Sequence, residues 1–110
     1  MPLIEALLMS PFLPGLIFVV AAIITKRFPP AHINPVYGYR TTKSMRSDQN
    51  WKTANAYSTQ LLLISGIILM VAGATVALLV NNTLLLSILT PVSVIIAVLV
   101  IFLRTEKRLQ

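Results

Sequence analysis

Three long apolar segments alternate with polar ones along this chain. The apolar segments cover about residues 3–25, 58–80 and 84–103. Each is close to the roughly 20 residues of helix that cross the hydrocarbon core of a bilayer. A short polar turn separates the second segment from the third, whereas the polar segment at residues 26–57 separates the first from the second. The pattern predicts an all-α integral membrane protein with three transmembrane helices and a structured loop at 26–57, in a single domain over residues 1–110.

The first apolar segment contains helix-breaking residues near its start. Pro11 and Pro14 lie within it, in the pairs Ser10-Pro11 and Pro14-Gly15. Proline removes a backbone donor and clashes with the preceding turn, so we expect this helix to be kinked or locally unwound near residues 10–15. A helix that restarted at Pro11 would have only about 15 residues, too few to cross the bilayer. The whole segment is therefore predicted to form one interrupted span.

A second helix is expected to begin before the second apolar segment. Ser44 or Ser47 can cap it, and Asp48 suits its first turn. No proline or glycine follows until Gly66. We therefore expect this helix to start near residue 47 and to run without a break into the membrane. At helical spacing, one of its faces would carry Trp51, Ala54, Asn55, Ser58 and Leu62.

The charged residues indicate how the helices are oriented. Only 11% of the residues are charged, against about 25% in soluble domains. The net charge is +6, and six of the nine Lys and Arg lie between residues 26 and 60 while residues 61–103 carry no charge. The positive-inside rule places the loop and the carboxyl terminus in the cytoplasm and the amino terminus outside the plasma membrane. Basic residues beside membrane spans favour anionic lipid headgroups at the cytoplasmic face as partners, and no nucleic acid.

The chain offers little of the chemistry that catalysis needs. It has one histidine, His32, no cysteine, and three carboxylates scattered at Glu5, Asp48 and Glu106. These residues supply no nucleophile with a base, no metal-ligand set and no phosphate-binding glycine loop. We therefore expect a protein that is not an enzyme and that uses no metal or cofactor. A small transporter or lipid-handling protein working as an oligomer is the alternative, and a proton-coupled exporter would need Glu5 inside a helix bundle.

The loop and the start of the next helix hold the candidate site residues Asn34, Tyr37, Gly38, Arg40, Thr41, Ser44, Trp51 and Asn55. Gly38 permits a tight turn, and Asn34 and Thr41 can satisfy loop backbone groups. Arg40 carries a fork of donors that could hold a helix-end carbonyl, a lipid phosphate or a carboxylate. These residues either form a site for a ligand or partner, or only fold the loop against the helices. The sequence leaves both interpretations open.

Two glycines mark one face of the predicted second span. Gly66 and Gly73 lie seven residues apart. Small residues at such spacing let helices approach closely in a membrane. Three helices also leave a large surface for a second copy of the chain. We therefore assign both glycines to helix packing, with a homodimer seam as one use of them.

Several of the loop residues together resemble the signature of a known family. In order along the chain they are Phe28-Pro29-Pro30, Ile33-Asn34, Tyr37-Gly38-Tyr39-Arg40-Thr41, Ser44-Met45, Trp51 and Ala54-Asn55. This series is similar to that of the SdpI family of small bacterial membrane proteins, in which it lies between two membrane spans. The resemblance covers essentially the whole chain. It implies a domain of one span, the motif and two further spans, without catalytic residues.

The same resemblance implies a role in immunity or signalling. A longer member of the family, with additional spans, is the immunity protein against a secreted killing peptide and also holds a transcriptional repressor at the membrane. For this chain the resemblance implies immunity to an antimicrobial peptide, or membrane signalling. The basic loop would then be the docking or ligand site for a peptide toxin or a cytoplasmic regulator.

Overall fold

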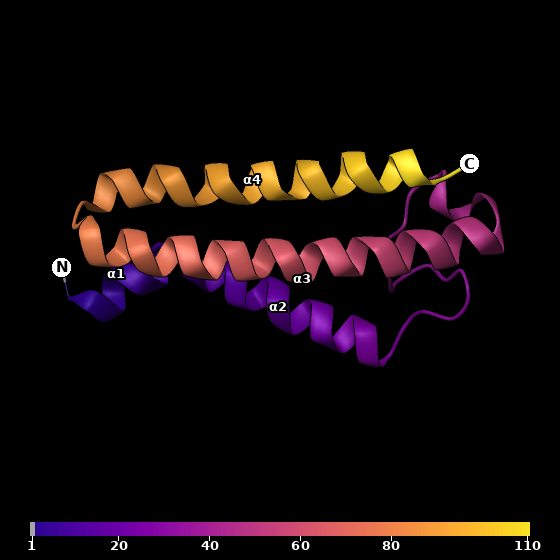
Figure 1. Cartoon of the computed structure of the whole chain (residues 1–110), viewed down its shortest axis with the longest axis horizontal. Helices are drawn as coiled ribbons and strands as arrows, with labels where there is room; N and C mark the ends of the chain where they lie inside the picture. The colour runs from indigo at the N-terminus through magenta and orange to yellow at the C-terminus, as the bar shows by residue number, and fades with distance from the viewer. Residues whose placement is uncertain (1) are drawn as a thin grey trace.

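Helices make up most of the chain in the computed structural model, which describes residues 2–110. In order they are α1 (Leu3–Met9), α2 (Phe12–Arg27), the short 3-10 helix η1 (Ser44–Arg46), α3 (Asp48–Leu79) and α4 (Thr83–Arg108). Helix α3 has 32 residues and lies between α2 and α4 (Figure 1). At about 1.5 Å of rise per residue, it runs along nearly the whole 49 Å length of the molecule. The prediction of an all-α fold is confirmed.

Two helices, α3 and α4, are long and apolar enough to cross a membrane. Helices α1 and α2 meet this test only together, and they are bent by 59° at the break between them. By length and composition, residues 2–110 therefore contain two candidate membrane spans, or three if the bent pair is a single span. The predicted interruption near residues 10–15 is confirmed, and it is centred on Ser10-Pro11.

Polar side chains satisfy the backbone at this break. The proline that follows Ser10 has no N–H to donate, so the helical hydrogen-bond ladder stops there. The hydroxyl of Ser10 donates to the carbonyl of Leu7 at 2.7 Å and accepts from the amide of Phe12 at 3.1 Å. From α4, the hydroxyl of Thr90 donates to the carbonyl of Met9 at 2.6 Å. Because unsatisfied backbone groups are costly in lipid, contacts of this kind would let such a bend lie within a membrane.

Glycines let α3 pack directly against the α1–α2 pair. A Cβ atom on Gly66 would lie 2.8 Å from the carbonyl oxygen of Gly15, and one on Gly15 would lie 2.7 Å from that of Gly66. A Cβ atom on Gly73 would lie 2.7 Å from the carbonyl carbon of Pro11, at the break. Both glycines therefore serve helix packing, as predicted, and in this structure they pack within one chain, since α2 and the break cover the surface that the sequence suggested as a homodimer seam.

Side-chain caps define where the two long helices begin. The hydroxyl of Ser47 accepts from the amide of Asn50 at 3.1 Å, directly before α3. The side-chain oxygen of Asn82 accepts from the amide of Leu85 at 3.2 Å, directly before α4. The start of a helix near residue 47, predicted from the capping pattern, is therefore confirmed.

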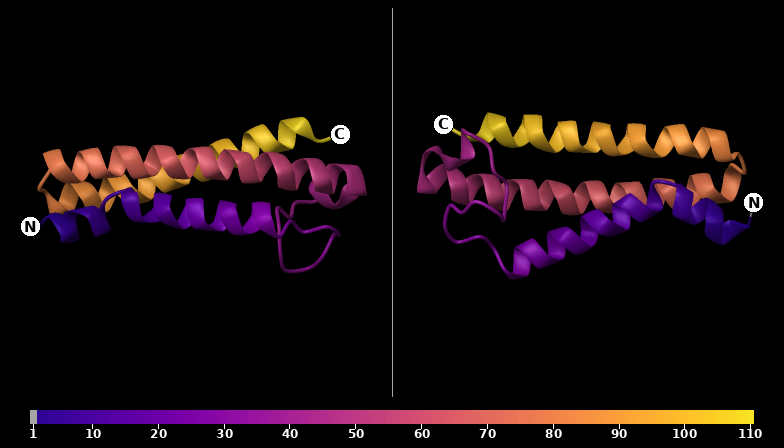
Figure 2. Two further views of the ribbon diagram at one scale, coloured as in Figure 1. Left: turned by 60° about the horizontal axis from the view of Figure 1, so that its bottom comes forward. Right: turned by 180° about the vertical axis from the view of Figure 1, so that it is seen from behind.

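Large apolar side chains cover the outside of the helices. Ile17 on α2, Ile68 on α3 and Ile95 on α4 are 58%, 61% and 58% exposed. Water-soluble proteins rarely expose apolar surface this extensively, whereas lipid accepts it. The segment that joins α2 to α3, residues 28–47, lies at the same end of the molecule as the carboxyl terminus (Figure 2). We call this segment the motif loop.

Candidate functional site

The motif loop begins with a compact turn built by Asn34. Its side-chain Oδ1 accepts from the amides of Val36 at 3.0 Å and Tyr37 at 2.6 Å. Its Nδ2 donates to the carbonyls of His32 at 3.0 Å and Tyr37 at 2.9 Å. Asparagine favours such turns because its side chain can replace a peptide group in the hydrogen bonds. The hydroxyl of Tyr37 donates to the carbonyl of Phe28 at 2.6 Å, which ties the turn to the end of α2.

Gly38 brings the loop against two buried residues of α3, Trp51 and Asn55. The φ of Gly38 is 111°, a left-handed conformation that L side chains rarely adopt. A Cβ atom there would lie 2.6 Å from Oδ1 of Asn55 and 3.2 Å from the ring of Trp51. The same Asn55 oxygen accepts from the amide of Tyr39 at 2.7 Å. Both the backbone conformation and the available space therefore require glycine at this contact.

Trp51 anchors the loop on α3. Its side chain is 1% exposed, and its indole N–H donates to the carbonyl of Pro30 at 2.7 Å. Nδ2 of Asn55 donates to the carbonyl of Trp51 at 2.9 Å, which orients the Asn55 amide toward the loop. The face predicted for this helix is confirmed by the burial of Trp51, Ala54, Asn55 and Ser58, with Leu62 half-buried.

Ser44 is the centre of a second group of polar contacts. Its side chain is fully buried. Its hydroxyl accepts from the amide of Thr41 at 2.8 Å and lies 3.0 Å from the carbonyl oxygens of Tyr39 and Thr41, either of which can accept its proton. In return, the hydroxyl of Thr41 accepts from the amide of Ser44 at 3.0 Å. These reciprocal bonds turn the chain from the loop into η1.

Tyr39 joins the loop to the end of α4. Its hydroxyl donates to the carbonyl of Phe102 over a long 3.4 Å. Burial, together with the nearby carboxylate of Glu106, raises the pKa of Tyr39 to about 12. The phenol therefore stays neutral and keeps its donor throughout the physiological pH range. The ammonium of Lys43 adds a second link, because it donates to the backbone carbonyl of Glu106 at 3.1 Å.

Asn50 is a structural residue that sequence reasoning missed. Its Nδ2 donates to the carbonyls of Lys43 and Gln110, both at 3.0 Å, and its Oδ1 accepts from the amide of Gln110 at 3.2 Å. The burial of Asn50 could have been predicted from the sequence, because Asn50, Ala54 and Ser58 follow one another at four-residue spacing on one helix face. Its pairing with Gln110 has no local signal, since the two residues are far apart in the sequence.

A cavity of about 650 Å³ lies between the motif loop and helices α2, α3 and α4. We call it the motif cavity. From the candidate site, its lining includes Tyr37, Gly38, Arg40, Thr41 and Asn55. Its apolar wall comprises Phe18, Leu62, Val98, Ile101 and Phe102. A largely apolar cleft with a few polar groups is the usual form of a ligand site.

Arg40 differs from the other candidate residues. The others take part in the contacts that build the loop, described above. Arg40 lines the motif cavity and is itself exposed. Its guanidinium is a permanent positive charge with donors arranged in a fork. Most of the motif therefore folds the loop, and the folded loop places Arg40 at a cavity.

The remaining ionisable candidates lie apart from this cavity. His32 is exposed in the loop, and Glu5 is exposed on α1. Across residues 2–110, no group of three or more His, Cys, Asp or Glu is placed to hold a metal ion.

Comparison with known proteins identifies the family. The sequence model of the SdpI/YfhL protein family matches residues 31–103, which include most of the motif loop, all of α3 and most of α4. Over 102 residues the chain is 39% identical to "Uncharacterized protein YfhL" of Bacillus subtilis (strain 168), covering 93% of this chain and 87% of that protein. No solved structure matches the chain. With its long apolar helices and its assembled motif, this chain belongs to the SdpI/YfhL protein family and is a multi-pass membrane protein.

Proposed function

We propose that this protein confers immunity to a membrane-active peptide, and that part of the peptide docks in the motif cavity. Membership of the SdpI/YfhL family supports an immunity-type role. The observation that carries the proposal is the position of Arg40, which is exposed at the cavity while the other motif residues fold the loop. A guanidinium on a well-supported loop can bind a carboxylate through two donors at once.

The walls of the motif cavity also suit a peptide. Leu62, Ile101 and Phe102 offer apolar surface, and Thr41 and Arg40 offer polar groups. Because the loop is already held by its own hydrogen bonds, little ordering is needed when a ligand binds. Membrane signalling is a second form of the same proposal. A peptide in the cavity would contact the motif loop and alter its conformation. A cytoplasmic regulator would then bind the altered loop.

A proton-coupled transporter has less support. Such proteins use a carboxylate or histidine at membrane depth. Glu5, the carboxylate of the first apolar segment, is exposed on α1 and lines neither the motif cavity nor the cavity beside Lys26 described below. Within one copy of the chain Glu5 is therefore not drawn into a helix bundle, which gives this alternative less support.

Replacing Arg40 with alanine should remove the protection. A strain lacking the gene is complemented with the wild type or a variant and exposed to a panel of membrane-active peptides. Relative to the wild type, Arg40→Ala should lower the inhibitory concentration of the cognate peptide about tenfold or more, because a hydrogen bond to a charged group contributes about 1.5–3 kcal/mol. Arg40→Lys keeps the charge but not the fork and should protect partly.

Arg46→Ala is the matched control for this experiment. It also removes one exposed arginine from the motif loop, but Arg46 does not line the motif cavity. This variant should protect as well as the wild type. Unchanged peptide sensitivity in both the deletion strain and the Arg40→Ala strain, with normal amounts of protein in the membrane, would refute the immunity proposal.

We further propose three spans in the plasma membrane, with the amino terminus outside and the motif loop and carboxyl terminus in the cytoplasm. The loop and the carboxyl terminus lie at one end of the molecule (Figure 1). They carry most of the basic residues, whereas the turn at residues 81–83 carries none, and basic segments stay in the cytoplasm.

Single cysteines can test this topology, because the chain has none of its own. A membrane-impermeant maleimide should label Asn81→Cys on intact cells and Val36→Cys only after the cells are opened. Leu3→Cys distinguishes the span counts: labelling on intact cells means three spans, and labelling only in opened cells means two. The reverse pattern at Asn81 and Val36 would overturn the orientation.

A further inference from the structure

A second cavity, of about 790 Å³, lies between α2, α3 and the start of the motif loop. Helix α2 runs obliquely away from α3 toward the loop (Figure 1), beyond the close contact of Gly15 with Gly66. The cavity occupies the opening between the two helices, beside Pro29 and Pro30. We call it the lysine groove, because Lys26 and Lys52 line it while Arg40 does not.

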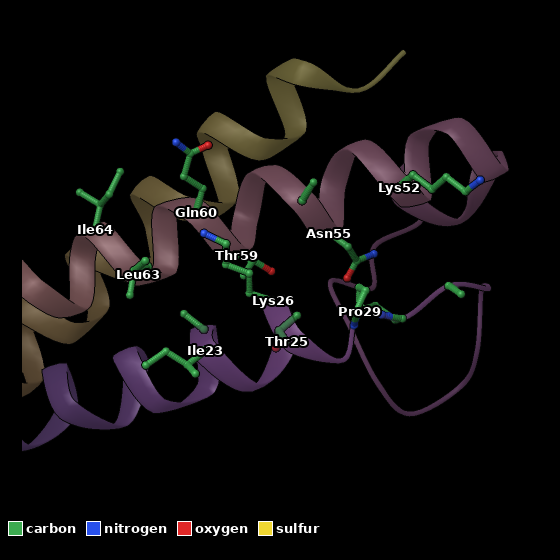
Figure 3. A pocket seen from close by; sticks show the side chains of 14 residues that line it. Ile23, Thr25, Lys26, Pro29, Lys52, Asn55, Thr59, Gln60, Leu63 and Ile64 are labelled. Atoms are coloured by element: carbon green, nitrogen blue, oxygen red, sulfur yellow. The ribbon is translucent and has the colours of Figure 1, made fainter.

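The lysine groove has a cationic part and an apolar part. Lys26 extends from α2 toward α3, beside Thr59 and Gln60, whereas Lys52 lies at the loop end of α3 and points away from Lys26 (Figure 3). The other end is lined by Ile23, Leu63 and Ile64. From residue 52 to residue 63 the groove follows about 16 Å of α3, at the helical rise of about 1.5 Å per residue.

No acidic side chain offsets the two lysines within the groove. Among residues 2–110, the lining of the groove contains no Asp or Glu. Asp48 is the nearest carboxylate along α3, one turn before Lys52, and it does not line the groove. The groove therefore attracts an anion at its loop end.

The apolar end of the groove opens toward lipid. Ile23 and Ile64 are 54% and 46% exposed on the outer faces of α2 and α3. Lys26 directly follows the apolar segment of α2, at the depth where a span meets the headgroup region, and a lysine can keep its ammonium in that region while its stem packs on apolar surface. A ligand can therefore enter from the bilayer with its polar end already at the height of the lysines.

We propose that the lysine groove binds an anionic phospholipid, with its phosphate at Lys26, with Lys52 adding positive charge at the loop end, and with an acyl chain along Ile23, Leu63 and Ile64. The cationic end matches the phosphate in charge, and the apolar end matches the chain. Thr59 and Gln60 supply donors at the height of the headgroup. This site is independent of the proposed immunity function, because Arg40 takes no part in it.

Lipid titration of the purified full-length chain in neutral detergent tests the proposal. Native mass spectrometry counts bound phosphatidylglycerol or phosphatidylcholine with identical acyl chains, and a parallel arm adds inorganic phosphate. The wild type should retain one phosphatidylglycerol in preference to phosphatidylcholine. Lys26→Gln/Lys52→Gln should weaken phosphatidylglycerol binding about 25-fold, because each basic residue near an anionic lipid contributes about fivefold.

Two further variants separate the groove from general charge attraction. Arg46→Gln/Lys107→Gln also removes two exposed positive charges at the same end of the molecule, but neither residue lines the groove. This control should bind lipid like the wild type. Ala56→Phe leaves every charge in place and puts a ring into the groove, so it should lose the lipid.

Three results would overturn the proposal. Equal weakening in the two double variants would mean that the lipid binds by surface charge alone. Equal retention of phosphatidylcholine and phosphatidylglycerol would mean that the lysines select no headgroup. Inorganic phosphate that displaces phosphatidylglycerol, or that stabilises the protein to the same degree, would mean a site for a small anion instead of a lipid.

Discussion

Trp51→Ala is expected to release the motif loop from α3. Trp51 is buried, its indole N–H bonds to the carbonyl of Pro30, and its ring packs against Gly38. Removal of a buried Trp side chain costs about 3–5 kcal/mol in well-packed cores. Hydrogen exchange followed by mass spectrometry, in nanodiscs, should show rapid exchange at the amides of Tyr39 and Ser44, which the wild type protects by hydrogen bonds.

The control variants for this experiment separate the ring from its hydrogen bond. Trp51→Phe keeps an aromatic ring but leaves the Pro30 carbonyl without its donor, so the cost should fall to about 1–3 kcal/mol. Gln49→Ala changes an exposed residue in the same turn of α3 and should leave exchange in the loop unaltered. If the amides of Tyr39 and Ser44 exchange as slowly in Trp51→Ala as in the wild type, the Trp51 side chain does not hold the loop.

Gly73→Ala should separate α3 from the α1–α2 break. The added Cβ would meet the amide nitrogen of Phe12 and would lie 2.7 Å from the carbonyl carbon of Pro11. Overpacking typically costs about 1–3 kcal/mol, and we expect the upper end because both neighbours are backbone atoms that cannot rotate away. Thermal unfolding in detergent, followed by circular dichroism, should show a lower midpoint than the wild type.

Ala72→Val is the matched control for Gly73→Ala. It adds bulk on the same turn of α3, but Ala72 is exposed and has room for it. Its unfolding midpoint should stay close to that of the wild type. If Gly73→Ala and Ala72→Val unfold at the same temperature, the close approach at Gly73 contributes nothing to stability.

Much of the helical architecture could be read from local sequence. The interruption of the first span follows from Pro11, because proline removes a backbone N–H and its ring clashes with the preceding turn. The start of α3 follows from Ser47, whose hydroxyl needs only a backbone amide three residues on. The buried face of α3 follows from the spacing of Trp51, Asn55 and Ser58. In each case the cause and its effect lie within one or two turns of the helix.

The candidate site was predictable in its members but not in their separate roles. The resemblance selected Asn34, Gly38, Arg40 and Trp51 together, and they lie at one end of the molecule. That Arg40 faces a cavity while the others support the loop depends on how α2, α3 and α4 meet around it. The contact of Asn50 with Gln110 was not predicted for the same reason, since only the packing of α4 on α3 brings the two residues together.

The sequence by itself determined which segments are apolar enough for a bilayer, where the helices begin and break, and which end of the molecule is basic. These properties depend on hydropathy, caps, proline and charge, which act at short range along the chain. Only the tertiary structure decided that Gly66 and Gly73 serve packing within one chain, and that α2 diverges from α3 to leave a groove beside Lys26. Those outcomes depend on contacts between residues far apart in the sequence, because a glycine lets two backbones approach closely only where the fold brings another segment against it.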